Sequence, residues 1–332
     1  MSEREPLPQR VCRLLCDGQF HSGTALAASC GVSRNAIWKA IAGLRQFGMS
    51  VHAVANRGYR IPNASELLDA RQITALLPES VASRLRAGQC IWRTSSTNLD
   101  LLARAAGPVR SFDFLTAECQ TKGRGRRART WYAPPCGAIC LSMSWNFPVL
   151  PPDASALGLA VGVCVLRALN KVGVPGVSLK WPNDLVVNGD KLGGILIELR
   201  AESAGPAYVV IGIGVNVVLG DEVHRQIEAS GTRAADLLGL GVQRADRNAV
   251  VSALIASTVA GLDQYERDGF SGFAAEWRAA DALAGKAVVV SSESGSVTGH
   301  ARGIDVDGAL CVQTRDGLQR FVTGDVSVRA VT

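Results

Sequence analysis

The chain lacks the features that mark a membrane protein or a secreted protein. Its longest nearly uncharged apolar stretch, residues 156 to 166, is roughly half of the ~20 residues that a membrane-spanning helix needs. The first six residues, Met-Ser-Glu-Arg-Glu-Pro, contain no apolar segment of the kind found in a secretory signal. We therefore expect no membrane span and a cytoplasmic protein.

The chain also lacks any CxxC pair, and its nine cysteines are an odd number. This usage argues against a disulfide scaffold, and we interpret the thiols as reduced and buried. The spacings Cys12/Cys16 and Cys136/Cys140 are compatible with metal ligation, but none of the four histidines lies near either pair. We therefore do not expect a zinc site.

What the chain does have is an ordinary globular composition with an uneven distribution of charge. Its 332 residues are 47% hydrophobic and 19% charged, enough for two or three folded domains. The net charge is +6, and residues 1 to 65 carry +5 of it, with eight basic and three acidic side chains. A small basic module joined to a nearly neutral body is typical of a DNA-binding head on a larger domain.

The pattern of residues within this head indicates a winged helix-turn-helix. Residues 8 to 17 form an amphipathic helix, and a second helix begins near His21 and ends at Gly31. Ser33 is a good N-cap for a third helix that runs to Phe47. Residues 51–54 and 59–61 then flank a turn, which predicts a β-hairpin wing.

The third helix and the wing supply the residues expected to contact DNA. Ile37, Ile41 and Leu44 recur at helical spacing and must face the core, so the remaining positions face outward. A protein-interaction module of the same fold is the alternative. Trp38, near the recognition face, does not suit DNA binding, and we expect it to pack under the wing or against another domain. The predicted contacts to phosphates and bases are Ser33, Arg34, Asn35, Lys39, Arg45 and, on the wing, Arg57.

The body alternates strands and helices after a connecting helix predicted at residues 66–77. More than one hairpin in this region favours an α+β domain with a mixed or antiparallel sheet. From about residue 284, five short strands within some fifty residues predict a small closed barrel. The expected domains are 1–63, 64–281 and 282–332.

Residues 122–131, Lys-Gly-Arg-Gly-Arg-Arg-Ala-Arg-Thr-Trp, form the sharpest motif of the body. Five cations in ten residues exclude a core element, because burying unpaired charge is too costly. Residues 123–128 formally match the dinucleotide fingerprint G-x-G-x-x-A, but Pro134 and Pro135 prevent the helix that this fingerprint requires. We expect a mobile surface loop that binds a phosphorylated or carboxylated small ligand, with nucleic acid as the alternative.

Two further clusters can carry chemistry. Residues 180–184, Lys-Trp-Pro-Asn-Asp, are followed by Lys191 at the start of an apolar strand, where its ammonium group can face a pocket. A solvated lysine is the alternative, and composition alone favours it. The sequence Gly212-Ile213-Gly214-Val215-Asn216 contains paired glycines that let a ligand approach the backbone, and tight packing of this strand against a helix is the alternative.

Together these motifs resemble the biotin protein ligases. Ser96-Thr97-Asn98, residues 117–120, the Gly-Arg-Gly-Arg-Arg loop, Lys-Trp-Pro-Asn-Asp, residues 191–196 and residues 212–216 follow one another in the order found in that family. With the winged head, residues 8 to 330 resemble the bifunctional biotin ligase and biotin operon repressor of bacteria. Two positions depart from the family pattern, Ala128 where glycine is common and Leu99 where glutamine is common.

This resemblance implies an activity, its cofactors and its partners. ATP, with Mg²⁺, would activate biotin to biotinyl-5′-adenylate, and the biotin would pass to a lysine of a biotin carboxyl carrier protein. The adenylate-loaded protein would bind operator DNA as a homodimer, and the tail would be an SH3-like barrel. A lipoate-type ligase and a biotin-sensing transcription factor without ligase activity are the alternatives.

The resemblance also implies roles for individual residues. Lys191, Arg126 and Asp184 would be catalytic, and Asp184 would also help to hold Mg²⁺. Trp131, Asn183 and Asn216 would contact ATP or the adenylate. The residues implied to bind biotin are Ser96, Thr97, Asn98, Gln120, Gly123, Arg124, Gly125, Arg126 and Lys191.

Overall fold

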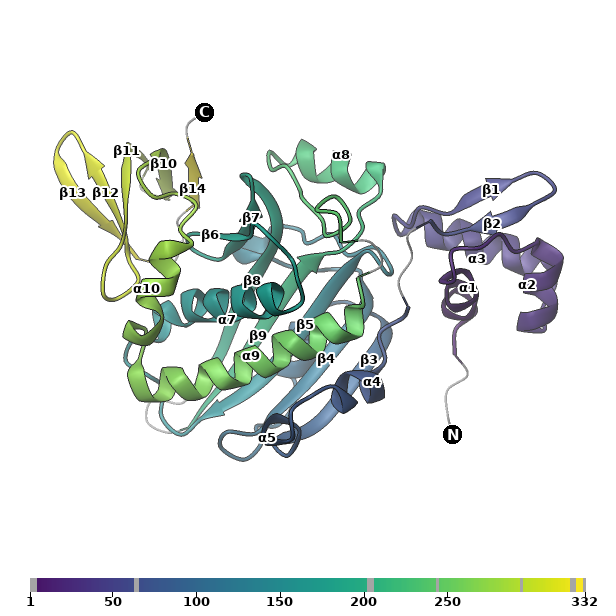
Figure 1. Cartoon of the computed structure of the whole chain (residues 1–332), viewed down its shortest axis with the longest axis horizontal. Coiled ribbons are helices and arrows are strands. Elements are labelled where there is room, and N and C mark those ends of the chain that lie inside the picture. The colour runs from purple at the N-terminus through teal and green to yellow at the C-terminus, as the bar shows by residue number, and fades with distance from the viewer. Residues whose placement is uncertain are drawn as a thin grey trace.

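The computed structural model describes residues 5–62, 66–201, 206–242, 245–292, 295–322 and 327–330. The chain forms a helical head, a central domain built on a large sheet, and a small C-terminal sheet on the opposite side of the central domain (Figure 1). The predicted boundary at residues 63 and 64 lies outside the described residues.

The head is a winged helix-turn-helix, as the sequence predicts. Ser22 and Ser33 cap the second and third helices by accepting hydrogen bonds from Ala25 N and Ala36 N at 3.0 and 3.2 Å. Gly31 ends the second helix in the left-handed conformation, with φ +64°. The elements are α1 (Leu7–Leu15), α2 (Gly23–Cys30), α3 (Arg34–Gln46), β1 (His52–Val54) and β2 (Gly58–Arg60).

The connector between head and body differs from the predicted helix over residues 66–77. Residues 66–69 are extended, and two short helices follow, α4 (Ala70–Ala75) and α5 (Glu79–Ala82). The Asp69 carboxylate caps α4 by accepting hydrogen bonds from Arg71 N and Gln72 N, so the helix begins only there. Long-range partners hold the extended part, because Glu118 accepts from Leu68 N and Arg247 donates to Glu66 O.

In the described part of the chain, the central domain contains a seven-stranded mixed sheet in the order β3-β4-β5-β9-β8-β7-β6. The pair β3 and β4 is parallel and the other neighbours are antiparallel, which confirms the predicted mixed sheet. The strands are β3 (Leu85–Thr94), β4 (Phe112–Gln120), β5 (Ala138–Phe147), β6 (Ser178–Lys180), β7 (Asp184–Val187), β8 (Asp190–Ala201) and β9 (Ala207–Asn216).

Long helices pack against this sheet and complete the core (Figure 1). By length and hydropathy, residues 154–171 would suffice to cross a membrane, but 61% of that window is buried inside the fold, so it is a core helix. Short 3₁₀ turns are η1 (Arg126–Ala128) and η2 (Ala154–Ala156). The helices are α6 (Thr97–Leu102), α7 (Leu157–Lys171), α8 (Asp221–Ala229), α9 (Arg247–Asp268) and α10 (Ser271–Ala279).

The C-terminal part is an antiparallel sheet that packs onto the central domain. Its described residues form five strands in the order β13-β12-β11-β10-β14, and no ladder within them joins β13 to β14 to close a barrel. Trp181 donates from Nε1 to Gly308 O at 3.0 Å, which ties this sheet to the Lys-Trp-Pro-Asn-Asp motif. The strands are β10 (Ala287–Ser292), β11 (Gly295–Ile304), β12 (Leu310–Thr314), β13 (Gly317–Phe321) and β14 (Ser327–Ala330).

Candidate functional site

Most of the predicted ligand-binding residues line one pocket of about 1140 Å³. It is lined by the arginine-rich loop, by β8 and β9, and by β14 of the C-terminal sheet. Gly123 is not among the lining residues; a Cβ there would meet Trp131 O at 2.6 Å, so this glycine shapes the loop. The predicted residues that line the pocket are Ser96, Thr97, Asn98, Gln120, Arg124, Gly125, Arg126, Trp131, Asn183, Asp184, Lys191 and Asn216.

One end of the pocket is a buried polar cluster around the start of α6. Ser142 Oγ lies 2.7 Å from Thr97 Oγ1 and 2.5 Å from Asn98 Oδ1. Gln120 Oε1 accepts a hydrogen bond from Thr97 N at 2.8 Å, and Asn98 Nδ2 donates to Glu198 Oε2 at 2.8 Å. Hydrogen-bonded polar groups at the floor of a pocket can recognise a small polar ring by its donors and acceptors.

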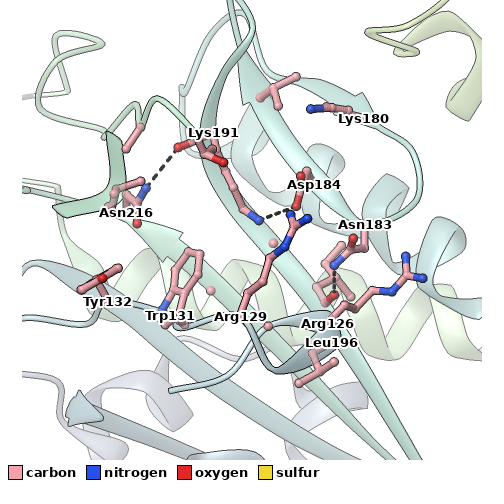
Figure 2. A pocket seen from close by; sticks show the side chains of 18 of the residues that line it. Arg126, Arg129, Trp131, Tyr132, Lys180, Asn183, Asp184, Lys191, Leu196 and Asn216 are labelled. Carbon is pink, nitrogen blue, oxygen red and sulfur yellow. Dashed lines mark hydrogen bonds and ion pairs between the residues drawn. The ribbon is translucent and has the colours of Figure 1, made fainter. Parts of the chain in front are cut away.

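Lys191 lies at the other end, paired with Asp184. Its Nζ donates to Asp184 Oδ1 at 2.5 Å, and both side chains are partly buried, with 28% and 21% exposed (Figure 2). Asn216 Nδ2 donates to Lys191 O at 3.2 Å and to Ala235 O at 3.0 Å, which fixes the backbone at the start of β8. The reading of Lys191 as a solvated lysine is therefore wrong.

Lys180 adds a second ammonium group close to this pair. Burial lowers the pKa of Lys180; the positive charges of Lys191, Arg329 and Arg129 lower it further, while Asp184 opposes the shift. Two ammonium groups and one carboxylate leave this end of the pocket positive. Such a site suits a phosphate or a carboxylate.

The arginine-rich loop is a folded hairpin over the pocket. Gly125 N donates to Arg129 O at 2.8 Å, and Trp131 N donates to Gly123 O at 2.9 Å. Figure 2 shows Arg129 extending toward the Lys191–Asp184 pair, whereas Arg126 lies alongside Asn183. Asn183 Nδ2 donates to Ile195 O at 2.8 Å. This hydrogen bond attaches the turn that precedes β7 to strand β8.

The paired glycines of β9 make room for two residues of the site. A Cβ at Gly212 would meet Asn98 Oδ1 at 2.5 Å, and a Cβ at Gly214 would meet the Trp131 ring at 2.6 Å. Gly212 is thus explained by packing against α6, the alternative given above, whereas Gly214 makes room for the side chain of a loop residue. The packed side chains themselves line the pocket, so the glycines set its shape.

Comparison with known proteins identifies the family. A model of the biotin/lipoate A/B protein ligase family matches residues 91–216, a biotin protein ligase C-terminal domain matches 284–329, and an HTH domain matches 11–60. The proteins named bifunctional ligase/repressor BirA from Salmonella typhimurium and Escherichia coli are 35% and 34% identical over 324 residues, 98% of this chain and of each relative. The chain belongs to this bifunctional biotin ligase and repressor family.

Two further proteins similar to this chain are named as biotin ligases. The biotin--[acetyl-CoA-carboxylase] ligase of Mycobacterium tuberculosis is 39% identical over 240 residues, 70% of this chain and 86% of that protein. The solved biotin protein ligase of Aquifex aeolicus in complex with biotin and ATP has a TM-score of 0.63 and 26% identity. It covers 74% of this chain and 100% of that structure.

The head of the ligase/repressor exposes all six predicted DNA contacts. Ser33, Arg34, Asn35 and Lys39 are exposed, on the side of α3 away from its buried residues. Arg45 and Arg57 are also exposed, and each has a partner within the head: Arg45 donates to Val51 O at 2.6 Å, and Arg57 lies 4.3 Å over the Phe20 ring. Trp38 is 59% exposed, so the suggestion that it packs under the wing or against another domain is wrong.

Several pocket residues of the ligase/repressor were not predicted from the sequence. Lys180 and Arg129 belong to motifs that were recognised, and their charge was the available signal. Lys286 and Arg329 come from the C-terminal part, and nothing in their local sequence marks them. Of the two departures from the family pattern, Leu99 is 39% exposed, and the side chain of Ala128 lies outside the described residues.

Proposed function

We propose that this chain is an ATP-dependent biotin protein ligase that also acts as a biotin-responsive repressor in the cytoplasm. It forms biotinyl-5′-adenylate and transfers biotin to a lysine of a biotin carboxyl carrier protein. The observation that carries the proposal is the pocket that joins the buried polar cluster at Thr97 to the cationic end at Lys191. One end suits the ureido ring of biotin, and the other end suits a phosphate.

The proposed adenylation depends on positively charged side chains more than on a nucleophilic side chain of the protein. In the first step a biotin carboxylate oxygen attacks the α-phosphorus of ATP, the bond from that phosphorus to the β-phosphate bridging oxygen breaks, and pyrophosphate leaves. Two anions must therefore approach each other, and Lys191 supplies the positive charge between them. Arg124 and Arg126 of the loop enclose the adenylate, while Asn216 keeps the backbone of Lys191 in place.

The second step transfers the activated biotin. The amine of the carrier lysine attacks the acyl carbon, the bond to the phosphate oxygen breaks, and AMP leaves as the amine loses a proton. Ser96, Thr97 and Gln120 hold the ureido ring, and the apolar residues Ile195 and Leu196 lie along the pocket wall. The protein contributes binding and orientation in this step.

The proposed reaction includes a Mg²⁺ ion, which Asp184 would help to bind. Magnesium sites commonly combine one or two carboxylates with substrate phosphates, and Asp184 is a carboxylate at the cationic end of the pocket. When bound, the ion would neutralise phosphate charge. Asp184 also orients Lys191, whose Nζ lies 2.5 Å from its Oδ1.

Exchange of pyrophosphate into ATP tests the proposed reaction. We expect exchange that depends on biotin and does not occur with lipoate, because adenylation is reversible and the pocket is assigned to the ureido ring. Exchange with lipoate alone would identify a lipoate-type ligase. Absence of exchange with either acid, in protein that binds biotin, would identify a sensor without ligase activity.

For the regulatory half, we expect the adenylate-loaded protein to dimerise and to bind an inverted-repeat DNA site. Replacing both Arg34 and Lys39 by Ala should weaken this binding and reduce the dependence of log K on log salt by about one per lost phosphate contact. Biotinylation of the carrier protein should not change, because both residues lie on the head. Binding of the variant with the wild-type salt dependence would show that α3 does not contact DNA.

For the arginine-rich loop, we expect Arg126→Gly to form the adenylate but to release it early. Lysines of bystander proteins should then become biotinylated, which mass spectrometry of an added unrelated protein would detect. Lys122→Gly is the matched control, since it removes the same charge from the same loop outside the pocket. Ligand should also slow hydrogen exchange across residues 120–132 as anionic groups order the loop. Carrier-specific labelling by Arg126→Gly would assign retention of the adenylate to other residues.

A further inference from the structure

Three cysteines that are distant in sequence meet where the head contacts the central domain. Cys12 lies in α1, Cys16 is the residue that ends this helix, and Cys136 lies in the loop before β5. Their sulfur atoms all lie within 4.8 Å of one another, and Cys12 Sγ is 3.4 Å from Cys136 Sγ. This group differs from the sequence pairs Cys12/Cys16 and Cys136/Cys140. Cys136 lies with Cys12 and Cys16, and Cys140 is not part of the group.

The geometry suits a thiophilic metal ion. Zinc binds thiolates at about 2.3 Å, so a tetrahedral site separates its sulfur ligands by roughly 3.8 Å, close to the distances found here. A set of sulfur ligands without histidine selects a soft or borderline ion. Cys12 and Cys136 are buried, and Cys16 is of intermediate burial. With three sulfur ligands, a tetrahedral ion would take its fourth ligand from water or another donor.

A buried ion pair lies beside the cluster. Arg247 is fully buried and pairs with Glu118, and Cys136 N donates to Glu118 Oε2 at 3.2 Å. Within the described residues, the buried Arg247 Nε has no hydrogen-bond partner. Three thiolates and a divalent cation carry a net negative charge, which a neighbouring guanidinium stabilises.

The backbone at Cys136 is strained for any residue other than glycine. Its φ is +58°, in the left-handed region, which is unfavourable for a residue with a Cβ. The side chain is only 5% exposed. A glycine would relieve the strain, so Cys136→Gly removes the sulfur without introducing a backbone conflict.

We propose that Cys12, Cys16 and Cys136 bind one zinc ion or a similar thiophilic divalent cation, which clamps the DNA-binding head to the catalytic domain. Two ligands come from the head and one from the loop that continues the arginine-rich segment. An occupied site therefore restricts motion of the head relative to the pocket domain. This inference does not depend on the proposed ligase activity.

Metal titration of the reduced, metal-stripped full chain tests the proposal. We expect one Co²⁺ per chain with a thiolate-to-cobalt charge-transfer band, and displacement of Co²⁺ by Zn²⁺. Cys12→Ser and Cys136→Gly should weaken binding by about 100-fold or more, because losing a ligand exceeds the 10–100-fold effect of losing an outer partner. Cys90→Ser is the matched control and should bind like wild type.

Hydrogen exchange of α1 measures whether the bound ion restricts motion of the head. Zn²⁺ should slow exchange across residues 7–15 in the wild type and leave it unchanged in Cys136→Gly. The proposal is overturned if wild type binds no stoichiometric Co²⁺ or Zn²⁺, or if Cys136→Gly binds them equally well. A Cys12–Cys136 disulfide recovered from metal-treated protein without bound metal would also overturn it, and would make the cluster a redox pair.

Discussion

Lys191→Ala should lower the rate of biotin adenylation on the order of 100-fold or more, while the protein stays folded. The Lys191 ammonium is held by Asp184 at the cationic end of the pocket, where carboxylate and α-phosphate must meet. Its contribution grows as negative charge concentrates in the transition state. Biotin-dependent pyrophosphate exchange measures this step, and thermal unfolding checks the fold.

Two variants separate the role of this ammonium from the effect of losing any positive charge. Lys171→Ala removes an exposed cation from the end of α7, outside the pocket, and should leave the exchange rate unchanged. Lys191→Arg keeps the charge but replaces a compact ammonium by a planar guanidinium, so it should recover only part of the rate.

The second half-reaction gives an independent check on Lys191. With biotinyl-5′-adenylate supplied directly, the two anions are already joined, so transfer to the carrier should fall much less than adenylation. Near-normal adenylation by a well-folded Lys191→Ala variant would place the catalytic cation elsewhere, with Lys180 and Arg129 as the nearest alternatives in the pocket.

The sequence predicts the head well because short-range signals determine its elements. Ser22, Ser33 and Gly31 act on backbone groups within a few residues, and the structure places all three as helix caps. The spacing of Ile37, Ile41 and Leu44 likewise predicts which side of α3 is buried. No distant residue is needed to explain these features.

Features that depend on residues far apart in sequence could not be predicted from local patterns. The predicted helix over 66–77 begins late because side chains from β4 and α9 bind its first residues. The same holds for Arg329 in the pocket and for the meeting of Cys12 with Cys136, which are 124 residues apart. Motif resemblance identified the pocket residues, but only the fold shows which of them face one another.

Arg247→Met should destabilise the protein by about 3 to 5 kcal/mol, since it leaves the Glu118 carboxylate buried without its cation. Arg247 Nη1 and Nη2 donate to this carboxylate at 2.8 and 3.0 Å. The side chains of Arg247 and Glu118 are 0% and 4% exposed. Burial raises the pKa of Glu118, and the charge and hydrogen bonds of Arg247 oppose that shift. The variant also loses the bond to Glu66 O, which holds the connector beside the head. Urea unfolding followed by fluorescence and circular dichroism measures the effect.

The exposed pair Arg225–Glu222 provides the matched control for this buried pair. Its side chains are 72% and 61% exposed, so Arg225→Met should leave the midpoint of urea unfolding nearly unchanged. Glu118→Leu combined with Arg247→Met should recover part of the loss, because no uncompensated charge remains. Recovery should stay incomplete, since Leu68 N and Cys136 N also donate to Glu118 and would lose their acceptor. If Arg247→Met unfolds at the same urea concentration as Arg225→Met, the Glu118–Arg247 pair does not hold the connector to the central domain.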